Sequence, residues 1–469
     1  MTQGTTTDCP TIVQHSTAHA SLAALGVQLR HLDLFGPIRQ QVHIAQKTVR
    51  YTPTDKLYDA FIALLPGAHG LVEINGRLRP DPALQAAFGR GSCAEQSVVQ
   101  ETLDACTAET VEQMEAAWAL IYRHHSQGYR HPYADDWQVL DVDMSGMPCG
   151  KKAAMATTGY FAKQRNRRGR QLGRVMATRY REIVVDRLFD GKTQLNVALL
   201  PLVSAAEVTL DLDAAKRERT LIRIDAGAGS ISDINWLLMR GYFVVSKDYS
   251  TARARLLAKQ VRDWIGDPRD GERQVGLVPG PASDYHAGNY RRTITRVAVR
   301  CRLANGQWGV GVVVSSLPLA DACALAGLDA TAAATDPTLA VLAYVYLYDQ
   351  RGGGVETSFK EDQQGLGITK RTKKRFAAQQ VVALLGALAH NVLTWAKRWV
   401  LALAPVIERL GIKRLVRDVF GITGRVAVDG EGHVRQIVLN QANRLARHLL
   451  AALQALASSA DVAVSLGET

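Results

Sequence analysis

The chain has 469 residues and a net charge of +12, from 56 lysines and arginines against 44 aspartates and glutamates. With 47% hydrophobic residues it has the composition of a globular protein, and its length predicts two to four domains at roughly 100 to 200 residues each. The positive balance favours a polyanionic partner such as a nucleic acid, with solubility alone as the alternative.

The same sequence disfavours zinc-ribbon, secreted and membrane proteins. The six cysteines lie far apart without a Cys-x-x-Cys pair, so we expect neither a zinc ribbon nor a disulfide framework, and we predict a reducing, cytoplasmic setting. Residues 1–7 lack the basic start and apolar core of a signal peptide. The most apolar stretch, residues 376–406, is interrupted by Lys397, Arg398 and other polar residues, so it predicts a buried helix and no membrane partner.

Residues 1–130 predict a helical N-terminal DNA-binding domain. From residue 20 to about residue 127 the apolar spacing is helical, with breaks at glycines and prolines. Residues 82–89 and 92–103 have the pattern of two helices joined by a glycine-containing turn, which is how a helix-turn-helix presents its second helix to the major groove. A pair of helices that only pack together has the same pattern, and it stays open as the alternative.

Strand patterns begin near Asp135 and predict the first part of an α/β domain over residues 131–270. Asp225 ends one of these strands, and an amphipathic helix over residues 231–240 and a strand over residues 242–246 complete a β-α-β unit. Asp225 therefore lies at the carboxyl end of a strand, where open α/β sheets place their sites. The strands predicted before this helix cover residues 139–143, 180–188, 208–212 and 221–225.

The second half of the chain divides into three further regions. Residues 271–345 predict a β-rich insertion, and residues 346–400 return to the α/β domain with a helix that carries Glu356. Residues 401–469 predict a mainly helical C-terminal region. The elements expected in this half are strands over residues 292–301 and 308–314 around an Asn-Gly turn, a hairpin over residues 426–435 and a final helix over residues 439–456.

Two aspartates at strand ends are the first candidates for a metal site. Asp141 and Asp143 lie two apart on one strand, so both side chains point to the same face and either could bind a metal. Asp143 is preferred because it is the last residue before the polar turn at Ser145. Asp225 ends a second strand. A role in forming a turn is the alternative for Asp143 and Asp225.

Glu356 is the third candidate, and its neighbours Tyr348 and Arg351 give it weight. On a helix Lys360 lies one turn after Glu356, so an ammonium and a carboxylate face the same groove. The alternative is a solvated ion pair worth only a few tenths of a kcal/mol. Magnesium takes oxygen ligands, so three carboxylates from different elements suffice for two-metal phosphoryl transfer.

Together these features resemble the DDE transposases of bacterial insertion sequences, in the subgroup marked by a Tyr-Arg-Glu-Lys signature. The resemblance covers most of the chain, from about residue 20 to residue 399. It implies an α/β fold with an RNase H-like mixed sheet and a β-rich insertion, preceded by a helical N-terminal domain and followed by a mainly helical C-terminal region. It also implies that Asp143, Asp225 and Glu356 bind two Mg²⁺ ions, which Mn²⁺ can replace, and that Tyr348 and Arg351 contact terminal DNA phosphates.

The spacing departs from the family pattern at two points. The family has three residues between the arginine and the glutamate, whereas four residues separate Arg351 from Glu356 here. The family also has a lysine seven residues after the glutamate, whereas Gln363 stands at that position and Lys360 can supply the charge. Glu361 stays open as the alternative third carboxylate.

Two basic clusters predict a phosphate-binding surface, because each phosphate neutralised by a lysine or arginine releases counterions. A solvated basic loop is the alternative for each cluster. The DNA contacts that we predict in and near these clusters are Lys163, Arg167, Arg168, Arg170, Lys370, Arg371, Lys373 and Lys374, together with Lys360.

These features predict a transposase, an endonuclease that cleaves double-stranded DNA at the terminal inverted repeats of an insertion sequence and then joins the freed 3′ ends to target DNA. The resemblance implies a homodimer on the DNA. Two alternatives stay open: a catalytically inactive transposase-derived DNA-binding protein or regulator, and a general nuclease with the same fold.

Overall fold

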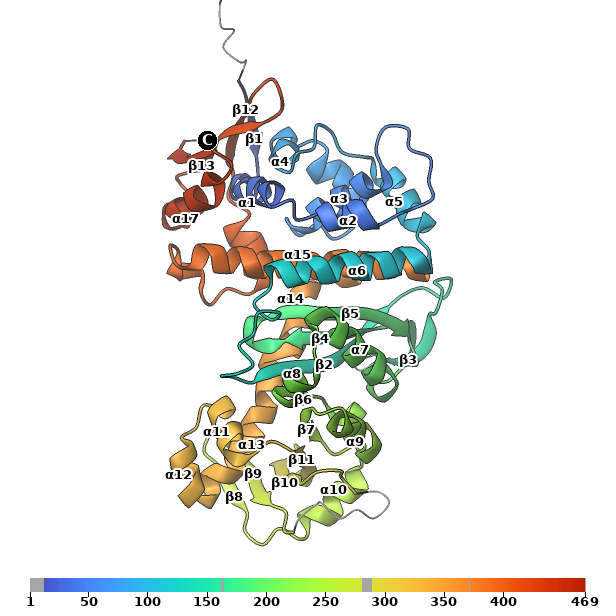
Figure 1. The fold of residues 1–469 in the computed structure, drawn as a ribbon, viewed down its shortest axis with the longest axis vertical. Helices are drawn as coiled ribbons and strands as arrows, with labels where there is room; N and C mark the ends of the chain where they lie inside the picture. Colours follow the sequence, from blue (N-terminus) through green and yellow to red (C-terminus); the bar gives the residue numbers. More distant parts are fainter. Residues whose placement is uncertain (1–11, 162–163, 281–288, 371, 469) are drawn as a thin grey trace, which may run out of the picture. The chain divides into compact units, whose positions relative to one another are not determined.

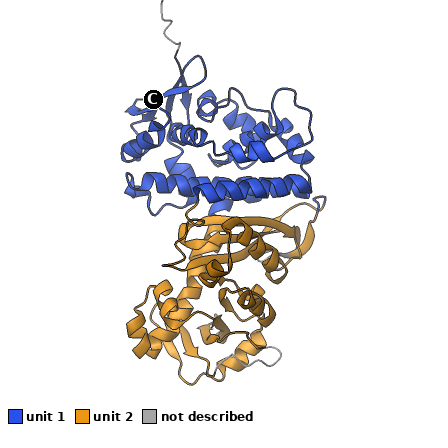
Figure 2. Ribbon diagram, viewed as in Figure 1, with its two compact units in different colours: residues 1–125, 152–154, 360–469 blue, residues 126–151, 155–359 orange. Residues whose placement is uncertain are grey.

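The computed structural model describes residues 12–161, 164–280, 289–370 and 372–468, so Lys163 and Arg371, two of the predicted DNA contacts, lie outside the described residues. The chain divides into two compact units, which Figure 2 shows in different colours. Unit 1 comprises residues 1–125, 152–154 and 360–469, and unit 2 comprises residues 126–151 and 155–359.

Helices make up most of unit 1, as the apolar spacing predicts for its N-terminal part. The prolines and capping residues of the sequence begin two of them: Thr52 and Asp55 exchange capping hydrogen bonds of 3.1 and 3.0 Å around Pro53, and Asp81 caps the helix that begins at Pro82. The predicted helix pair over residues 82–89 and 92–103 corresponds to α4, Pro82–Ala87, and α5, Gln96–Ala105. The helices are α1 Ala20–His31, α2 Gly36–Gln41, α3 Pro53–Leu64, α4 Pro82–Ala87, α5 Gln96–Ala105 and α6 Ala108–His125, with a π-helical turn η1 Ile74–Leu78.

The predicted buried helix is α15, Phe376–Leu401, in unit 1. It is long and apolar enough to cross a membrane, but 89% of its most apolar window is buried within the structure, as in the core helix of a folded domain. Its polar residue His390 is also buried, and His390 Nδ1 lies 2.6 Å from Asp362 Oδ1 of α14, Thr357–Gly365. The polar residue His390 therefore has a protein partner, as buried polar groups require.

A small sheet closes unit 1 and brings its two ends together. The strand order is β1-β12-β13-β14, so β1, Val13–Thr17, pairs with β12, Gly424–Val428. The predicted hairpin is confirmed as β12 and β13, Val434–Asn440. The predicted final helix begins later than expected, at α17 Ala446–Ser458, because β13 still pairs with β14, Ala463–Gly467, as far as Asn440. Shorter turns are η5 Ile368–Lys370, η6 Pro405–Ile407, α16 Ile412–Arg414 and η7 Leu415–Val419.

The described part of unit 2 contains a ten-stranded mixed sheet. Five of its strands run β5-β4-β2-β6-β7 across the sheet (Figure 1), with β6 and β7 parallel to β2 and with β4 and β5 forming antiparallel pairs. This order confirms the predicted α/β class with an RNase H-like sheet. The strands are β2 Gln138–Pro148, β3 Thr157–Phe161, β4 Gln164–Ala177, β5 Glu182–Asp190, β6 Thr220–Arg223 and β7 Phe243–Lys247.

One predicted strand of unit 2, residues 208–212, is wrong. These residues form the end of α7, Leu195–Leu210, whose apolar face is buried, and Asp211 ends the helix in a left-handed conformation with φ of 54°. A short β-branched run therefore becomes the last turn of a helix that starts much earlier. The following helices are α8 Ala214–Glu218, α9 Ile231–Met239 as predicted, α10 Thr251–Ala258, α11 Leu319–Ala326, α12 Ala330–Thr335 and α13 Pro337–Arg351.

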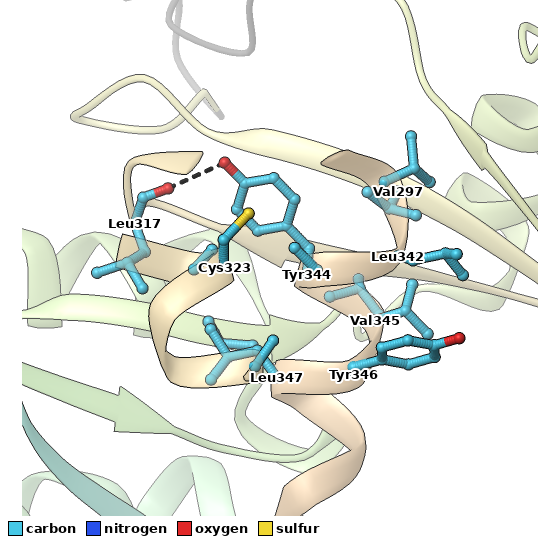
Figure 3. Packing of buried hydrophobic residues seen from close by; sticks show 14 of the residues in the cluster. Val297, Leu317, Cys323, Leu342, Tyr344, Val345, Tyr346 and Leu347 are labelled. Carbon is cyan, nitrogen blue, oxygen red and sulfur yellow. Dashed lines mark hydrogen bonds between the residues drawn. The ribbon is translucent and has the colours of Figure 1, made fainter. Parts of the chain in front are cut away.

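The β-rich insertion extends the main sheet, because β11 pairs antiparallel with β7. One face of these added strands packs on α11 and α13 in a buried cluster that includes Val297, Cys323 and Leu342. Figure 3 shows this packing, with the Tyr344 hydroxyl donating to the Leu317 carbonyl at 3.2 Å. The strands are β8 Ile265–Asp267, β9 Asp270–Leu277, β10 Thr295–Arg302 and β11 Trp308–Ser315.

Candidate active site

A buried ion pair between the two central strands forms the base of the site. The register of β2 and β6 places Asp141 opposite Arg223. Arg223 Nε donates to Asp141 Oδ1 at 2.6 Å and Nη2 donates to Oδ2 at 2.9 Å, while the Thr178 hydroxyl donates to Oδ2 at 2.6 Å. The Asp141 and Arg223 side chains are almost completely buried. Asp141 is therefore committed to this pair, which favours Asp143 as the carboxylate that faces a ligand.

Asp143 lies two residues further along β2, and Asp225 lies two residues beyond the end of β6. Continuing the register of β2 and β6 places these two aspartates opposite each other, on the same face as Asp141 and Arg223. Asp143 Oδ1 accepts a hydrogen bond from the Met144 amide, and Asp225 Oδ1 accepts one from the Gly227 amide, each at 2.8 Å. Both line a cavity of about 720 Å³ whose other walls are residues 144–146, Thr158, Gly159, Gln171, residues 191–195 and Gly227.

Arg351 at the end of α13 connects Glu356 to Asp143. Its Nη1 donates to Glu356 Oε1 at 2.9 Å, and its Nη2 lies 2.9 Å from Asp143 Oδ1. In an α-helix, residues five apart would lie about 140° apart around the axis. Here a π-helical turn, η4 Gly352–Glu356, follows α13 and kinks at Gly354, so that Arg351 and Glu356 meet across the kink. The extra residue between arginine and glutamate is thus absorbed within the helix.

The π-helical turn depends on a glycine. Gly354 has φ of −92° and ψ of −108°, a conformation outside the helical region at which the helix kinks. A Cβ atom at Gly354 would lie 2.4 Å from Asp141 Oδ2 and 2.8 Å from Thr178 Cγ2. The helix that carries Glu356 can approach β2 this closely because position 354 has no side chain.

Negative charge accumulates around Asp143. Burial raises the pKa of Asp143 to about 6; Arg351 opposes the rise, and Asp225 and Glu356 add to it. Burial lowers the pKa of Arg351, but Asp143 and Asp225 outweigh this effect, so the guanidinium stays charged. Burial raises the pKa of Tyr348 to about 12, so its hydroxyl is protonated at neutral pH. Three carboxylates thus share one buried cation.

The carboxylates have the chemistry of a magnesium site, although within the described ranges no three side chains of His, Cys, Asp or Glu are arranged as a metal-binding group. Asp143, Asp225 and Glu356 offer only oxygen donors, which suit Mg²⁺. Three carboxylates face one cation, Arg351, and burial is the largest cause of the raised pKa of Asp143, to which Asp225 and Glu356 add. The donor set and its uncompensated charge fit a divalent cation.

Comparison with known proteins gives a family that agrees with this site. The family model described as the transposase DDE domain matches residues 136–392, more than half of the chain, and this range includes Asp143, Asp225 and Glu356. The chain belongs to the transposase DDE domain family. Members of this family generally use divalent metal ions. The chain is therefore a transposase by family, and its role lies in DNA transposition.

Two further comparisons complete this result. A solved structure of a piggyBac transposase synaptic complex with hairpin DNA aligns with 87% of the transposase described here and with 82% of its own chain. The sequence identity is 11% and the TM-score is 0.39. No curated protein matches the chain.

The predicted basic contacts of the transposase divide into exposed and buried residues. Arg167, Arg168, Lys360, Lys370 and Lys374 are exposed. Two others do not belong to an exposed surface, which corrects the prediction. Arg170 on β4 is 1% exposed, and Lys373 is buried with its Nζ 2.7 Å from Gln100 Oε1.

Glu361, the alternative third carboxylate, has a structural contact in unit 1. Its Oε2 accepts a hydrogen bond of 2.9 Å from the Lys413 amide in the first turn of α16. A carboxylate at a helix N-terminus satisfies amides that lack partners within the helix. This contact explains Glu361 without a metal and favours Glu356 for the site.

Sequence reasoning missed Arg223 and Thr178, which hold Asp141 in place. Arg223 stands in the otherwise apolar run of residues 221–224 and is the one polar residue there. A buried arginine needs an anionic partner, and Asp141 is the buried carboxylate in the same register of the neighbouring strand. The sequences of β2 and β6 contain both residues of this ion pair, but predicting the pair requires the register between the two strands.

Proposed function

We propose that this transposase cleaves double-stranded DNA at the ends of a mobile element and joins the freed 3′ ends to target DNA, with Asp143, Asp225 and Glu356 as its catalytic carboxylates. The observation that carries the proposal is the contact of Arg351 with both Asp143 and Glu356, made through the π-helical turn. It joins Glu356, which follows the kink, to Asp143 on the central strand β2, beside the cavity that Asp225 also lines.

Asp143, Asp225 and Glu356 would hold two Mg²⁺ ions, which Mn²⁺ can replace. When bound, such ions activate a water or a DNA 3′ hydroxyl and stabilise the leaving oxygen. The protein contributes the fixed positions of the carboxylates. Asp141 and Arg223 anchor the two strands below them, and Arg223 Nη1 also donates to the Leu347 carbonyl of α13 at 2.8 Å. This ion pair therefore contacts β2, which carries Asp143, and the elements that directly precede Asp225 and the turn with Glu356.

Arg351 and Tyr348 are suited to contact a DNA phosphate at this site. Arg351 Nε is buried and makes no hydrogen bond to any described residue, so it can donate to a phosphate oxygen. The Tyr348 hydroxyl is protonated at neutral pH and can donate as well. These two residues would orient the scissile phosphate, and the exposed Lys360, Arg167, Arg168, Lys370 and Lys374 would contact the DNA backbone more distantly.

The finer identity follows the sequence resemblance. We propose a transposase of a bacterial insertion sequence in the Tyr-Arg-Glu-Lys subgroup, acting on terminal inverted repeats and on target DNA. Because two DNA ends must be joined together, a homodimer on the DNA is the expected assembly.

The test compares cleavage and binding of DNA from the flanks of the gene. We expect Mg²⁺-dependent cleavage by the wild type, its loss in Asp225→Asn and Glu356→Gln, and retained DNA binding in both variants. Glu361→Gln is the matched control, because its amide oxygen can still accept from the Lys413 amide, and it should cleave like the wild type. Cleavage by Glu356→Gln together with its loss in Glu361→Gln would reverse the assignment.

Two results would replace the proposed activity. Binding without cleavage by the wild type would indicate an inactive transposase-derived DNA-binding protein or regulator. Cleavage without joined products, when target DNA is supplied, would indicate a general nuclease.

A further inference from the structure

The hairpin of β10 and β11 extends beyond the edge of the sheet at which Asp225 lies. The pairing of β6 with β7 places Arg223 opposite Val245, so Asp225 is level with Lys247 at the end of β7. Lys247 pairs with Val313 of β11. Because β11 runs antiparallel to β7, residues 308–312 continue past this edge. The tip of the hairpin thus lies at the same end of the strands as the carboxylates, and the register places Arg300 and Arg302 on the face of the sheet opposite to Asp225.

One face of this hairpin carries arginines and a tryptophan. Arg302 pairs with Trp308 and Arg300 pairs with Val310, so these four side chains share a face. The opposite face carries Val297, Val299 and Cys301, which pack in the core. On the first face α10 packs against β10 and β11, and Ala298 and Val312 are completely buried. Arg300 and Arg302 lie beyond these buried positions, towards the tip.

The arginines are stacked against indole rings. The guanidinium carbon of Arg300 lies 4.0 Å from the ring centre of Trp264 and 4.6 Å from that of Trp308, and the guanidinium carbon of Arg302 lies 4.5 Å from the ring centre of Trp308. Gln274 Oε1 accepts from Arg300 Nε and Nη2 at 2.7 and 2.6 Å. We name Trp264, Arg300, Trp308 and Arg302 the Trp-Arg stack. Its guanidinium groups are held in fixed orientations.

The Trp-Arg stack has positive charge without a carboxylate partner. The contacts of Arg300 are those with Gln274 and the two indoles, and Arg302 donates to the Gly306 carbonyl at 3.1 Å. Across the ranges that the structure describes, neither arginine forms an ion pair with Asp or Glu. Glu272 would follow opposite Arg302, but the pairing of β9 with β10 ends at Cys301 and no such ion pair forms.

We propose that the Trp-Arg stack binds the phosphodiester backbone of the DNA duplex that enters the carboxylate cavity. The proposal rests on the proposed function, because that function brings DNA to this edge of the sheet. The indoles cover the faces of the guanidinium groups, so the N–H edges remain for an anion, and guanidinium groups match phosphate oxygens in geometry. A stacked arginine is also already ordered, so it loses little freedom on binding.

A backbone contact is favoured over the stacking of a base on the tryptophans. The Trp308 ring is in contact with both arginines and the Trp264 ring is in contact with Arg300. The bases of an intact duplex are stacked on one another, whereas its phosphates are accessible along both strands. Charge complementarity therefore selects the backbone as the partner.

The experiment measures DNA affinity over a series of salt concentrations without metal, by fluorescence anisotropy of a labelled duplex from the gene's flank. For each of Arg300→Gln and Arg302→Gln we expect weaker binding and a slope of log K against log salt that is smaller by about 1. Arg262→Gln is the matched control, because it removes an exposed arginine of the same unit that stacks on no described ring. It should keep the wild-type slope. Thermal melts confirm that each variant is folded.

The outcomes separate the Trp-Arg stack from the catalytic proposal. Slopes that are unchanged in both variants, while the wild type cleaves DNA, would overturn this inference alone. Reduced slopes in a protein that never cleaves would support the inference and overturn the catalytic proposal. Absence of any DNA binding would overturn both. If Trp308→Leu loses affinity only for duplexes with unpaired terminal bases, the stack binds a base and the backbone contact is overturned.

Discussion

Arg223 on β6 holds Asp141 on β2 with hydrogen bonds of 2.6 and 2.9 Å, one layer below Asp143 and Asp225. The same guanidinium donates to the Leu347 carbonyl of α13. A single buried ion pair therefore links two strands and one helix, and each of these elements leads directly to one of the three proposed catalytic carboxylates. The position of the site depends on this pair although neither member faces the cavity.

The first prediction concerns Arg223→Met. The change leaves the carboxylate of Asp141 buried without its cation, and breaking a buried ion pair in this way costs about 3–5 kcal/mol. We expect a loss of this size in the free energy of unfolding, measured by urea denaturation, together with weaker cleavage. In the double variant Asp141→Asn with Arg223→Met the loss should be smaller than the sum of the two single losses. Additive losses would show that the two side chains do not depend on each other.

The second prediction compares two adjacent glycines of the π-helical turn. A Cβ at position 354 would overlap Asp141 Oδ2, whereas a Cβ at position 353 meets no atom within 4 Å. We expect Gly354→Ala to destabilise unit 2 by about 1–3 kcal/mol and to reduce cleavage, because the helix must move away from β2. Gly353→Ala should change stability by less than about 1 kcal/mol. Equal melting temperatures and cleavage rates for the two variants would refute the close approach.

The elements around the carboxylates could be predicted because their patterns are local. Three elements follow each other in sequence: the apolar run before Asp225, the amphipathic helix over residues 231–240 and the next strand. Each is recognised from its own spacing of hydrophobic residues. Asp225 could be placed after the end of a strand for the same reason, whereas β2 continues past Asp143 to Pro148 and corrects the expected strand end there. The resemblance to a known family then added Glu356, whose spacing alone would have indicated a surface ion pair.

Other parts depend on contacts between distant residues. The polar strand β1, Val13–Thr17, exists because β12 lies beside it, more than 400 residues later. Nothing within residues 208–212 shows that a helix started at Leu195 continues through Thr209. The burial of Arg170 and Lys373 also depends on tertiary packing, since a basic cluster has the same sequence whether it is exposed or buried. The π-helical turn requires a glycine at position 354, but glycines alone equally predict a loop.

The third prediction is a gain in stability when Asp143 is made neutral. The folded protein binds the proton of Asp143 more tightly than the unfolded chain, because the pKa is about 6 in the fold against an ordinary 3.8. The carboxylate therefore destabilises the fold increasingly as pH rises from about 4 to 6, and fully above that. In EDTA we expect Asp143→Asn to be more stable than the wild type by on the order of 2–3 kcal/mol at pH 8, and equal to it near pH 4.

The control for this prediction is Asp263→Asn, an exposed aspartate of the same unit. Its stability should match that of the wild type at both pH values. The Asp143 variant should at the same time lose cleavage. A lower stability of Asp143→Asn at pH 8 would mean that the ion pair with Arg351 outweighs burial and the neighbouring carboxylates.

The last prediction concerns His131, a buried histidine away from the cavity. Its Nδ1 lies 2.7 Å from the Tyr180 hydroxyl, and burial, together with Arg179 and Arg219, lowers its pKa to about 4 from 6.5. Between pH 4 and pH 6.5 the unfolded chain therefore binds a proton at His131 that the folded protein does not bind. Stability is fully present above pH 6.5 and should fall by about 3 kcal/mol as pH drops to 4.

We expect urea denaturation of His131→Gln to lose this part of the pH dependence, because glutamine does not titrate. The variant His448→Gln, at an exposed histidine, should retain the wild-type dependence. Since the two substitutions remove the same ionisable group, they differ only in burial and in the arginines nearby. Parallel stability profiles of His131→Gln and the wild type between pH 7 and 4 would show that other groups cause the acid sensitivity.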